Sequence, residues 1–535
     1  MGRFVNPNNN SFQVALNSPI YVDKTGLIAY TNSVLATMQG YICNSRPRRF
    51  GKSYAANMLT AYYSRGCDSE AMFAGLEISK SDDFKKHLNK YDVIHIDVQW
   101  FLANCGDAAH VVAYITSSVL AELREIYPTA LPSEVSHLSD ALSRIREKTG
   151  QKFIIIIDEW DALIRDPAAN SQVQDSYITF LRSMFKGTEP TKYILLAYLT
   201  GILPLRKEKS QSGLNNFDEF TMLSASRLAP YMGFTEVEVK KLTEKYHQNF
   251  SEVKSWYDGY LLKDTQVYNP RAIVSAMLHG DFKNYWAETA SSDAIMPLIS
   301  MNYDGLQFAI IEIISGAAVK VDTAVFTNDP SSIASKDDVL TYMIHLGYLG
   351  YNQNRKTAFV PNEEIRQELT MAVESKRWNE MITFQQESER LLDATLDMDG
   401  AAVAAQIEKI HHEYTSVIQY HNENSLSSVL TIAYLSAMQY YFKPIRELPT
   451  GRGFADFVLV PKPECRNDYP ALIVELKWNQ TAEAAITQIK RKQYVESLKD
   501  YRGEVILVGI NYESKELKKD DYKKHSCKIE RITMA

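Results

Sequence analysis

Short apolar runs alternate with longer amphipathic stretches over residues 1–225 of this chain. The short runs have the length of β-strands, and apolar positions in the longer stretches recur every three or four residues, as on one face of a helix. This alternation predicts a parallel sheet covered by helices. We expect strands at 40–44, 93–98, 153–158, 193–200 and 220–223, and helices at 54–64, 108–126, 137–148 and 176–185.

Length and composition set the scale of the molecule. The chain has 535 residues, of which 45% are hydrophobic, 23% charged and 11% aromatic. At roughly 100–200 residues per domain this length predicts three or four domains, and the composition has no signature of disorder. The formal net charge of -7 argues against a basic surface for nucleic acid over the whole molecule, while a local basic groove stays open.

The cysteines and the apolar runs predict the compartment. The five cysteines include no CxxC pair, which supports neither a disulfide framework nor a zinc ribbon. The first residues form no apolar signal segment, and every apolar run is shorter than the roughly 20 residues that span a bilayer. We therefore expect a cytoplasmic protein with no membrane partner. The sequence leaves open whether the chain forms homo-oligomers.

The segment between the first predicted strand and its helix ends in Gly51, Lys52 and Ser53. This is the second half of a phosphate-binding loop, in which backbone N–H groups surround the phosphates, the lysine contacts the outer phosphates and the hydroxyl binds Mg²⁺. The glycine that opens the full loop is replaced by Arg46. The half-motif predicts a nucleotide site but does not by itself predict hydrolysis.

The most apolar predicted strand, 153–158, ends in Asp158 and is followed by Glu159. Ligands of open parallel sheets bind at the carboxyl ends of the strands, where Asp158 would hold the Mg²⁺ that bridges the phosphates. Glu159 would orient or deprotonate the attacking water. The alternative, a buried strand ending in a charged turn, is weakened by the upstream loop. Thr200, which ends the next strand, either senses the γ-phosphate or is an ordinary strand terminus.

A second group of polar residues lies near the C-terminus, on two further predicted strands. Asp456 lies on the first of these strands, and Glu475 and Lys477 lie on the second. Because side chains alternate along a strand, Glu475 and Lys477 share one face. With Asp456 beside them, two carboxylates would hold Mg²⁺ near a cation, which is the equipment for metal-assisted phosphodiester hydrolysis. A surface hairpin that carries these residues by chance is the alternative.

Seven segments occur in a characteristic order. They are Tyr21-Val-Asp-Lys-Thr25, Arg46-Pro-Arg-Arg-Phe-Gly-Lys-Ser53, Ile157-Asp-Glu-Trp-Asp161, Leu199-Thr-Gly-Ile202, Leu214-Asn-Asn216, Trp256-Tyr-Asp-Gly-Tyr260 and Tyr268-Asn-Pro270. Together they resemble the bacterial and archaeal AAA-ATPase-like family, whose members commonly carry a C-terminal domain similar to PD-(D/E)XK nucleases. The resemblance covers nearly the whole chain. It implies that Arg46, Arg48 and Arg49 belong to the family's own form of the nucleotide-binding loop.

The C-terminal segment is similar to the PD-(D/E)XK core, in which the helix after the two strands faces the site. The resemblance implies that Gln488 on this helix contacts metal-bound water or DNA, although a solvated helix face explains the nearby charges almost as well. A helix at 425–441 would be the first helix of that fold, and Glu423 at its start would add an acid to the metal site. Glu447 competes with Glu423 for this role.

The predicted fold is α/β: a P-loop NTPase parallel sheet with a helical lid and a winged-helix-like region, followed by a restriction-endonuclease-like PD-(D/E)XK domain. The predicted parts are a P-loop AAA-ATPase-like domain at 1–227, a helical lid at 228–290, a winged-helix-like region at 291–370, a helical connector at 371–415 and a nuclease-like domain at 416–535. Winged helices bind DNA or clamp the nucleotide domain, and we favour the clamp here.

These features predict an ATP-binding and ATP-hydrolysing protein coupled to a Mg-dependent DNA endonuclease module, with Mn²⁺ as an alternative to Mg²⁺ in the nuclease site. The expected partners are ATP and DNA. Phage defence, mobile-element biology and repair all use such pairings, and the sequence does not separate them. The alternative is a regulatory or signalling ATPase whose C-terminal domain binds a protein or a nucleic acid without cutting it. A third class, a protein that binds nucleotide without hydrolysis, is disfavoured by Glu159.

Overall fold

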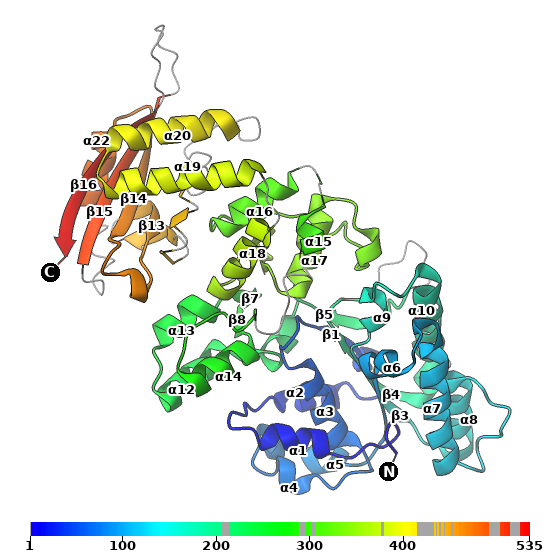
Figure 1. Ribbon diagram of the computed structural model, residues 1–535. Helices are drawn as coiled ribbons and strands as arrows, with labels where there is room; N and C mark the ends of the chain where they lie inside the picture. The colour runs from blue at the N-terminus through cyan, green and yellow to red at the C-terminus, as the bar shows by residue number, and fades with distance from the viewer. Residues whose placement is uncertain are drawn as a thin grey trace. The chain divides into compact units, whose positions relative to one another are not determined.

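The computed structural model divides into two compact units (Figure 1). It describes residues 2–205, 213–287, 296–301, 303, 305–375, 379–414, 433–434, 436–437, 440–442, 445–450, 453–491, 503–513 and 525–534. Unit 1 comprises Met1–Lys283 and Val321–Lys356, and unit 2 comprises Asn284–Lys320 and Thr357–Ala535. The chain therefore passes from one unit to the other three times, after residues 283, 320 and 356.

Unit 1 is built on a five-stranded parallel sheet in the order β2-β3-β4-β1-β5. The strands are β1 (Tyr41–Ser45), β2 (Asp92–Asp97), β3 (Phe153–Asp158), β4 (Ile194–Gly201) and β5 (Asp218–Phe220). The predicted parallel sheet is confirmed. β5 lies earlier in the sequence than predicted. It ends at Phe220 because the backbone N–H of Thr221 donates to the carbonyl of Ser224 and forms a turn. The exposed Asp218 and Glu219 also hide this strand from an apolar pattern.

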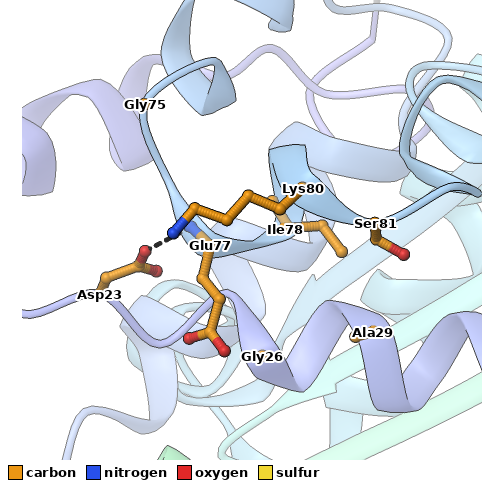
Figure 2. A pocket seen from close by; sticks show the side chains of 8 residues that line it. All are labelled: Asp23, Gly26, Ala29, Gly75, Glu77, Ile78, Lys80 and Ser81. Atoms are coloured by element: carbon orange, nitrogen blue, oxygen red, sulfur yellow. Dashed lines mark hydrogen bonds between the residues drawn. The ribbon is translucent and has the colours of Figure 1, made fainter.

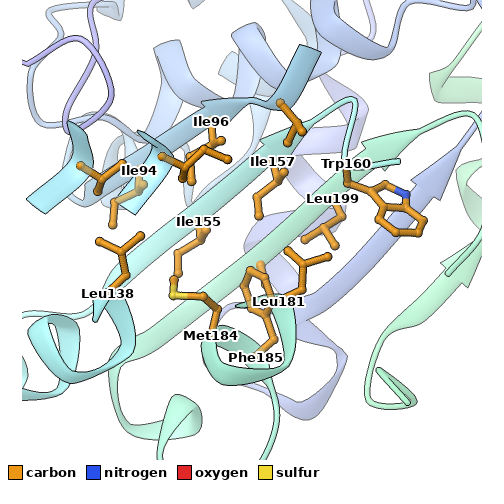
Figure 3. Packing of buried hydrophobic residues seen from close by; sticks show 14 of the residues in the cluster. Ile94, Ile96, Leu138, Ile155, Ile157, Trp160, Leu181, Met184, Phe185 and Leu199 are labelled. Carbon is orange, nitrogen blue, oxygen red and sulfur yellow. The ribbon is translucent and has the colours of Figure 1, made fainter. Parts of the chain in front are cut away.

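Helices cover both faces of this sheet, because successive strand residues point to opposite faces. One core contains Ile155 and Ile157 together with Leu138, Leu181 and Met184 from the covering helices (Figure 3). The second core contains the intervening strand residues and the apolar face of the helix that follows the phosphate loop. The main covering helices are α3 (Lys52–Tyr63), α7 (Val111–Ile126), α8 (Leu138–Thr149) and α10 (Ser171–Phe185).

The predicted helices are present with shifted ends. α10 begins at Ser171, five residues before the predicted 176, because the side chain of Asn170 accepts a hydrogen bond from the Val173 N–H at 3.0 Å and caps the helix. Further α-helices of unit 1 are α1 (Asn10–Leu16), α2 (Gly26–Ser33), α4 (Glu70–Phe73), α5 (Phe84–His87), α6 (Val98–Asn104), α9 (Ala162–Arg165) and α11 (Pro190–Tyr193).

Unit 1 also contains a small helical region beside a three-stranded sheet in the order β6-β8-β7. Its elements are β6 (Phe234–Thr235), α12 (Glu236–Tyr246), α13 (Phe250–Tyr257), β7 (Tyr260–Leu262), β8 (Thr265–Tyr268) and α14 (Pro270–His279). A capping box of Thr235 and Glu238 begins α12. The segment 321–356 adds α17 (Lys336–Leu346) and β10 (Gly350–Asn352) to the same unit. The domain boundaries drawn from the sequence stay predictions.

Unit 2 contains a second five-stranded sheet in the order β12-β13-β14-β15-β16. Only the β14–β15 ladder is parallel among the described strand pairs of this sheet. The strands are β12 (Ile445–Thr450), β13 (Gly453–Leu459), β14 (Ala471–Trp478), β15 (Gly503–Tyr512) and β16 (His525–Met534). One face packs on α19 (Asn379–Leu396) and α20 (Gly400–Tyr414), and the other packs on α22 (Ala482–Arg491). This mixed α/β layout agrees with the predicted nuclease-like fold.

Smaller elements complete unit 2. They are α15 (Met296–Ile299), α16 (Leu306–Ile314), α18 (Glu363–Ser375) and the antiparallel pair β9 (Val319–Lys320) and β11 (Thr357–Phe359). Glu423 and most of the helix predicted at 425–441 lie outside the described residues. Among the helices of the described residues, none combines the length and apolar composition needed to cross a membrane.

Candidate functional site

The loop between β1 and α3 has the backbone form of a phosphate-binding loop. Gly51 adopts a φ of 90°, a left-handed conformation that side chains disfavour, and it starts α3. Lys52 is 4% exposed, and its Nζ donates a hydrogen bond to the carbonyl of Pro47 at 3.2 Å. The lysine side chain therefore folds back toward the start of the loop.

Arg46 is fully buried and holds strand ends together. Its Nη1 donates to the carbonyls of Ser45 at 2.8 Å and of Phe220 at 3.0 Å, so it ties β1 to β5. Burial lowers the pKa of Arg46 to about 10. Of the three arginines predicted to belong to the nucleotide loop, Arg46 lies beneath it, whereas Arg48 is exposed and Arg49 is partly exposed.

Asp158 ends β3 beside the loop and is 4% exposed. Burial, together with the charges of Glu159 and Asp97, raises the pKa of Asp158 to about 7. A side-chain hydrogen bond with Ser53 and the positive charge of Lys52 oppose this rise. The hydroxyl and the carboxylate predicted to bind Mg²⁺ are thus neighbours, and a cation between them would satisfy the buried acid.

Glu159 lies directly after β3, and two cations contact its carboxylate. Lys52 Nζ is 3.4 Å from Oε1, and Arg165 Nη2 is 2.8 Å from Oε2. The φ of Glu159 is 49°, a left-handed conformation that its neighbours must hold in place. The structure therefore brings together the predicted lysine of the loop and the predicted general base.

Thr200 is fully buried at the end of β4, and its hydroxyl donates to the carbonyl of Asn44 at 3.0 Å. This bond links β4 to β1 just before the phosphate loop. Its role as a sensor of the γ-phosphate stays a prediction.

Two residues near the site were not among the sequence predictions. Asp97 ends β2, is paired in register with Asp158, and caps α6 by accepting from the Trp100 N–H at 3.0 Å. Burial raises the pKa of Asp97, and the charge of Glu159 raises it further. An aspartate at the end of an apolar strand was the available signal for Asp97. Arg165, on α9, had no signal beyond its position shortly after Glu159.

A cavity of about 580 Å³ lies beside the start of α2 (Figure 2). Its lining is Asp23, Gly26, Ala29, Gly75, Glu77, Ile78, Lys80 and Ser81. Asp23 Oδ2 accepts from the backbone N–H of Glu77 at 2.7 Å. No residue of the phosphate loop lines this cavity, so it does not mark the position of the phosphates.

In unit 2, three predicted residues meet between β14 and α22. Glu475 is 2% exposed, and its Oε1 is 3.1 Å from Lys477 Nζ and accepts a hydrogen bond from Gln488 Nε2. Asp456 on β13 precedes Phe457, which pairs with Val474, so its backbone lies at the level of Glu475. The side chain of Asp456 lies outside what the structure describes.

The metal site of unit 2 is described only in part. Among the described side chains of the chain, no group of three or more His, Cys, Asp or Glu residues has the geometry to hold a metal ion. Two predicted contributors, Asp456 and Glu423, lie outside that description, as does the side chain of Glu447. Carboxylates are the donors that Mg²⁺ and Mn²⁺ prefer, and Glu475 supplies one of them.

A parallel sheet with a phosphate loop after β1 and acids at the end of β3 is the fold of a P-loop NTPase. Residues 10–210 match the family model described as predicted AAA-ATPase, and residues 421–522 match the model of the PD-(D/E)XK nuclease superfamily. Both parts of the resemblance inferred from the motifs are confirmed. The chain thus joins an AAA-ATPase-like segment, which implies nucleotide binding, to a nuclease-superfamily segment.

Two individual proteins are similar to this chain at low sequence identity. An uncharacterized protein in the vnfD 5′ region of Azotobacter chroococcum mcd 1 is 25% identical over 289 residues, which are 52% of this chain and 52% of that protein. The chain thus spans about half the length of this curated relative. Among solved structures, the Aeropyrum pernix ORC2 protein (ADPNP–ADP complexes) matches with 11% identity and a TM-score of 0.30, covering 67% of this chain and 97% of that chain.

Proposed function

We propose that unit 1 binds ATP with Mg²⁺ and hydrolyses it. The observation that carries this proposal is the meeting of Lys52, Ser53, Asp158 and Glu159 at the carboxyl edge of the parallel sheet. Each of these side chains has a defined task in phosphoryl transfer.

The chain's own residues divide the work as follows. Lys52 exchanges its contact with Glu159 for the outer phosphates, and Ser53 and Asp158 hold the metal. Mg²⁺, when bound, supplies positive charge that offsets the charge developing on the transferred group. Glu159, released from Lys52, orients a water and accepts its proton.

Nucleotide binding is tested by thermal stabilisation. A nucleotide at about 100 times its dissociation constant stabilises the folded protein by about 2.7 kcal/mol. We expect MgATP to raise the melting temperature of the wild type and of Lys192→Ala, a substitution of a lysine that is 63% exposed. Lys52→Ala should lose this rise. An equal rise in Lys52→Ala would contradict the proposed site.

We further propose that unit 2 cleaves DNA with Mg²⁺ or Mn²⁺, under control of the nucleotide state of unit 1. The supporting observation is the meeting of Glu475, Lys477 and Gln488 on adjacent elements. Glu475 and Asp456 would hold the metal, Lys477 would place the scissile phosphate, and Gln488 would contact a water or the DNA. Glu423 is a further proposed ligand.

The cleavage proposal is tested on plasmid and linear DNA with the full chain, Mg²⁺ or Mn²⁺, and with or without ATP. Glu475→Ala should abolish cutting, whereas Glu504→Ala, a glutamate on β15 that is 51% exposed, should retain it. Intact DNA under every condition refutes the nuclease. ATP turnover without cleavage would instead favour a regulatory ATPase whose second unit binds a partner.

The wider setting is also a proposal. We place the protein in the cytoplasm, on the basis of its cysteines and its apolar runs, and in bacterial phage defence or mobile-element biology, on the basis of the family resemblance and the paired domains.

A further inference from the structure

The guanidinium of Arg165 joins two carboxylates at the candidate ATPase site. Its Nη2 contacts Glu159 Oε2 at 2.8 Å, and its Nε contacts Asp161 Oδ2 at 2.7 Å. The side chain is 11% exposed, so water weakens these contacts little. Arg165 therefore fixes the distance and the angle between the predicted general base and a second acid.

Asp161, the second acid, is itself anchored to the end of β4. It is fully buried, and its carboxylate accepts from the backbone N–H groups of Ile202 at 3.2 Å and of Leu203 at 2.8 Å. Gly201 makes room for this contact, because a Cβ atom added there would lie 2.4 Å from Asp161 Oδ1. The chain of contacts runs from the sheet through Asp161 and Arg165 to Glu159.

Lys52 and Arg165, the two cations that contact Glu159, would respond differently to the binding of a nucleotide. The phosphates of a nucleotide would bind Lys52, so the contact between Lys52 Nζ and Glu159 Oε1 at 3.4 Å would break. Arg165 is already held by Asp161 and keeps Oε2. Glu159 would then present Oε1 to a water while its other oxygen stays fixed.

We propose that Arg165 is the positioning residue for Glu159 in ATP hydrolysis, through the pair that it forms with Asp161. This inference rests on the proposed ATPase activity. The arrangement has the logic of a general base oriented by a third group, in which the orienting group touches neither substrate nor water. A positioned general base contributes about 10²- to 10⁴-fold to rate, and loss of its orientation removes part of that factor.

The test compares Arg165→Gln and Arg165→Lys with Arg144→Gln in the full chain. Arg144 forms a pair with Asp140 at the same spacing of four residues, but it is 48% exposed, so it controls for loss of such a pair. The measurements are kcat and KM for MgATP, and the affinities for MgADP and for MgADP with aluminium fluoride, which mimics the transferring phosphoryl group.

We expect Arg165→Gln to lower kcat by about 10- to 100-fold while KM and MgADP affinity change by less than about 2-fold. The affinity for the aluminium fluoride complex should fall in parallel with kcat. Arg165→Lys should recover part of kcat, because one ammonium replaces one of two contacts. Arg144→Gln should resemble the wild type.

Three results would overturn the inference. An unchanged kcat means that Glu159 needs no orientation by Arg165, and a raised kcat means that Arg165 restrains Glu159. Equal losses in MgADP and fluoride-complex affinity mean a purely structural role. If the wild type binds MgADP but hydrolyses no ATP, the proposed activity fails, and the ratio of the two affinities still decides whether Arg165 acts on the transition-state complex.

Discussion

Asp158→Asn is expected to stabilise the nucleotide-free protein at alkaline pH. Burial raises the pKa of Asp158 from 3.8 to about 7, and the nearby acids Glu159 and Asp97 contribute. A carboxyl whose pKa is raised by folding stabilises the protein fully below its unfolded value, and this stability is lost as the pH rises through the folded value. A shift of about 3 units corresponds to about 4 kcal/mol, of which roughly 2.5 kcal/mol is lost between pH 5 and pH 8.

The amide introduced by Asp158→Asn would keep the shape of the side chain without the charge. We therefore expect the unfolding free energy of this variant, relative to that of the wild type, to rise by about 2–3 kcal/mol from pH 5 to pH 8. Urea unfolding followed by hydrogen exchange in peptides from β3 and α3 measures unit 1 alone. Asp82→Asn, a substitution of an exposed aspartate, is the matched control.

With Mg²⁺ and nucleotide bound, we expect the wild type to be more stable than Asp158→Asn. Ligand binding stabilises the wild type in proportion to RT ln(1 + [L]/Kd), whereas Asp158→Asn lacks the carboxylate for the metal. A difference between variant and wild type that stays constant from pH 5 to pH 8 would refute the reasoning, because the energy would then not reside in a buried charge.

Two further substitutions test the packing around the sites. Gly233→Ala should cost several kcal/mol of stability, because Gly233 has a φ of 85° and an added Cβ would lie 2.2 Å from Val267; retained stability in a thermal scan would contradict this. Glu363→Ala should cost about 3–5 kcal/mol in unit 2, because it removes the buried carboxylate that pairs with Arg366 at 2.9 Å and with Lys462 at 3.1 Å, and a loss below about 1 kcal/mol in urea unfolding would contradict this.

Apolar periodicity was enough to predict the sheet of unit 1, since β3 and β4 read as nearly continuous hydrophobic runs and β1 and β2 each contain a short apolar stretch. β5 was displaced because it begins with the exposed Asp218 and Glu219 and has only three residues. Only Phe220 of its three residues is buried, so the sequence of β5 resembles that of a loop.

The sequence predicted those site residues that lie at the carboxyl ends of the strands or directly after them. Parallel strands bring their carboxyl ends to one edge, so Lys52 and Asp158 had to meet once both motifs were recognised. Arg165 was missed because α9 has four residues and its facing follows from tertiary packing alone. Arg46 was predicted to belong to the nucleotide loop, and nothing in a single sequence distinguishes a loop arginine from one that is buried against carbonyls.

The segment Val321–Lys356 has a consequence for dissecting the protein. Lys320 and Thr357 are paired on neighbouring strands of unit 2, so the segment leaves and returns at one place, like an insertion in a hairpin. A short turn joining these two residues would remove α17 and β10 together without breaking the pair. Such a shortened chain would show, in a single genetic change, what the whole segment contributes to the folding of unit 1.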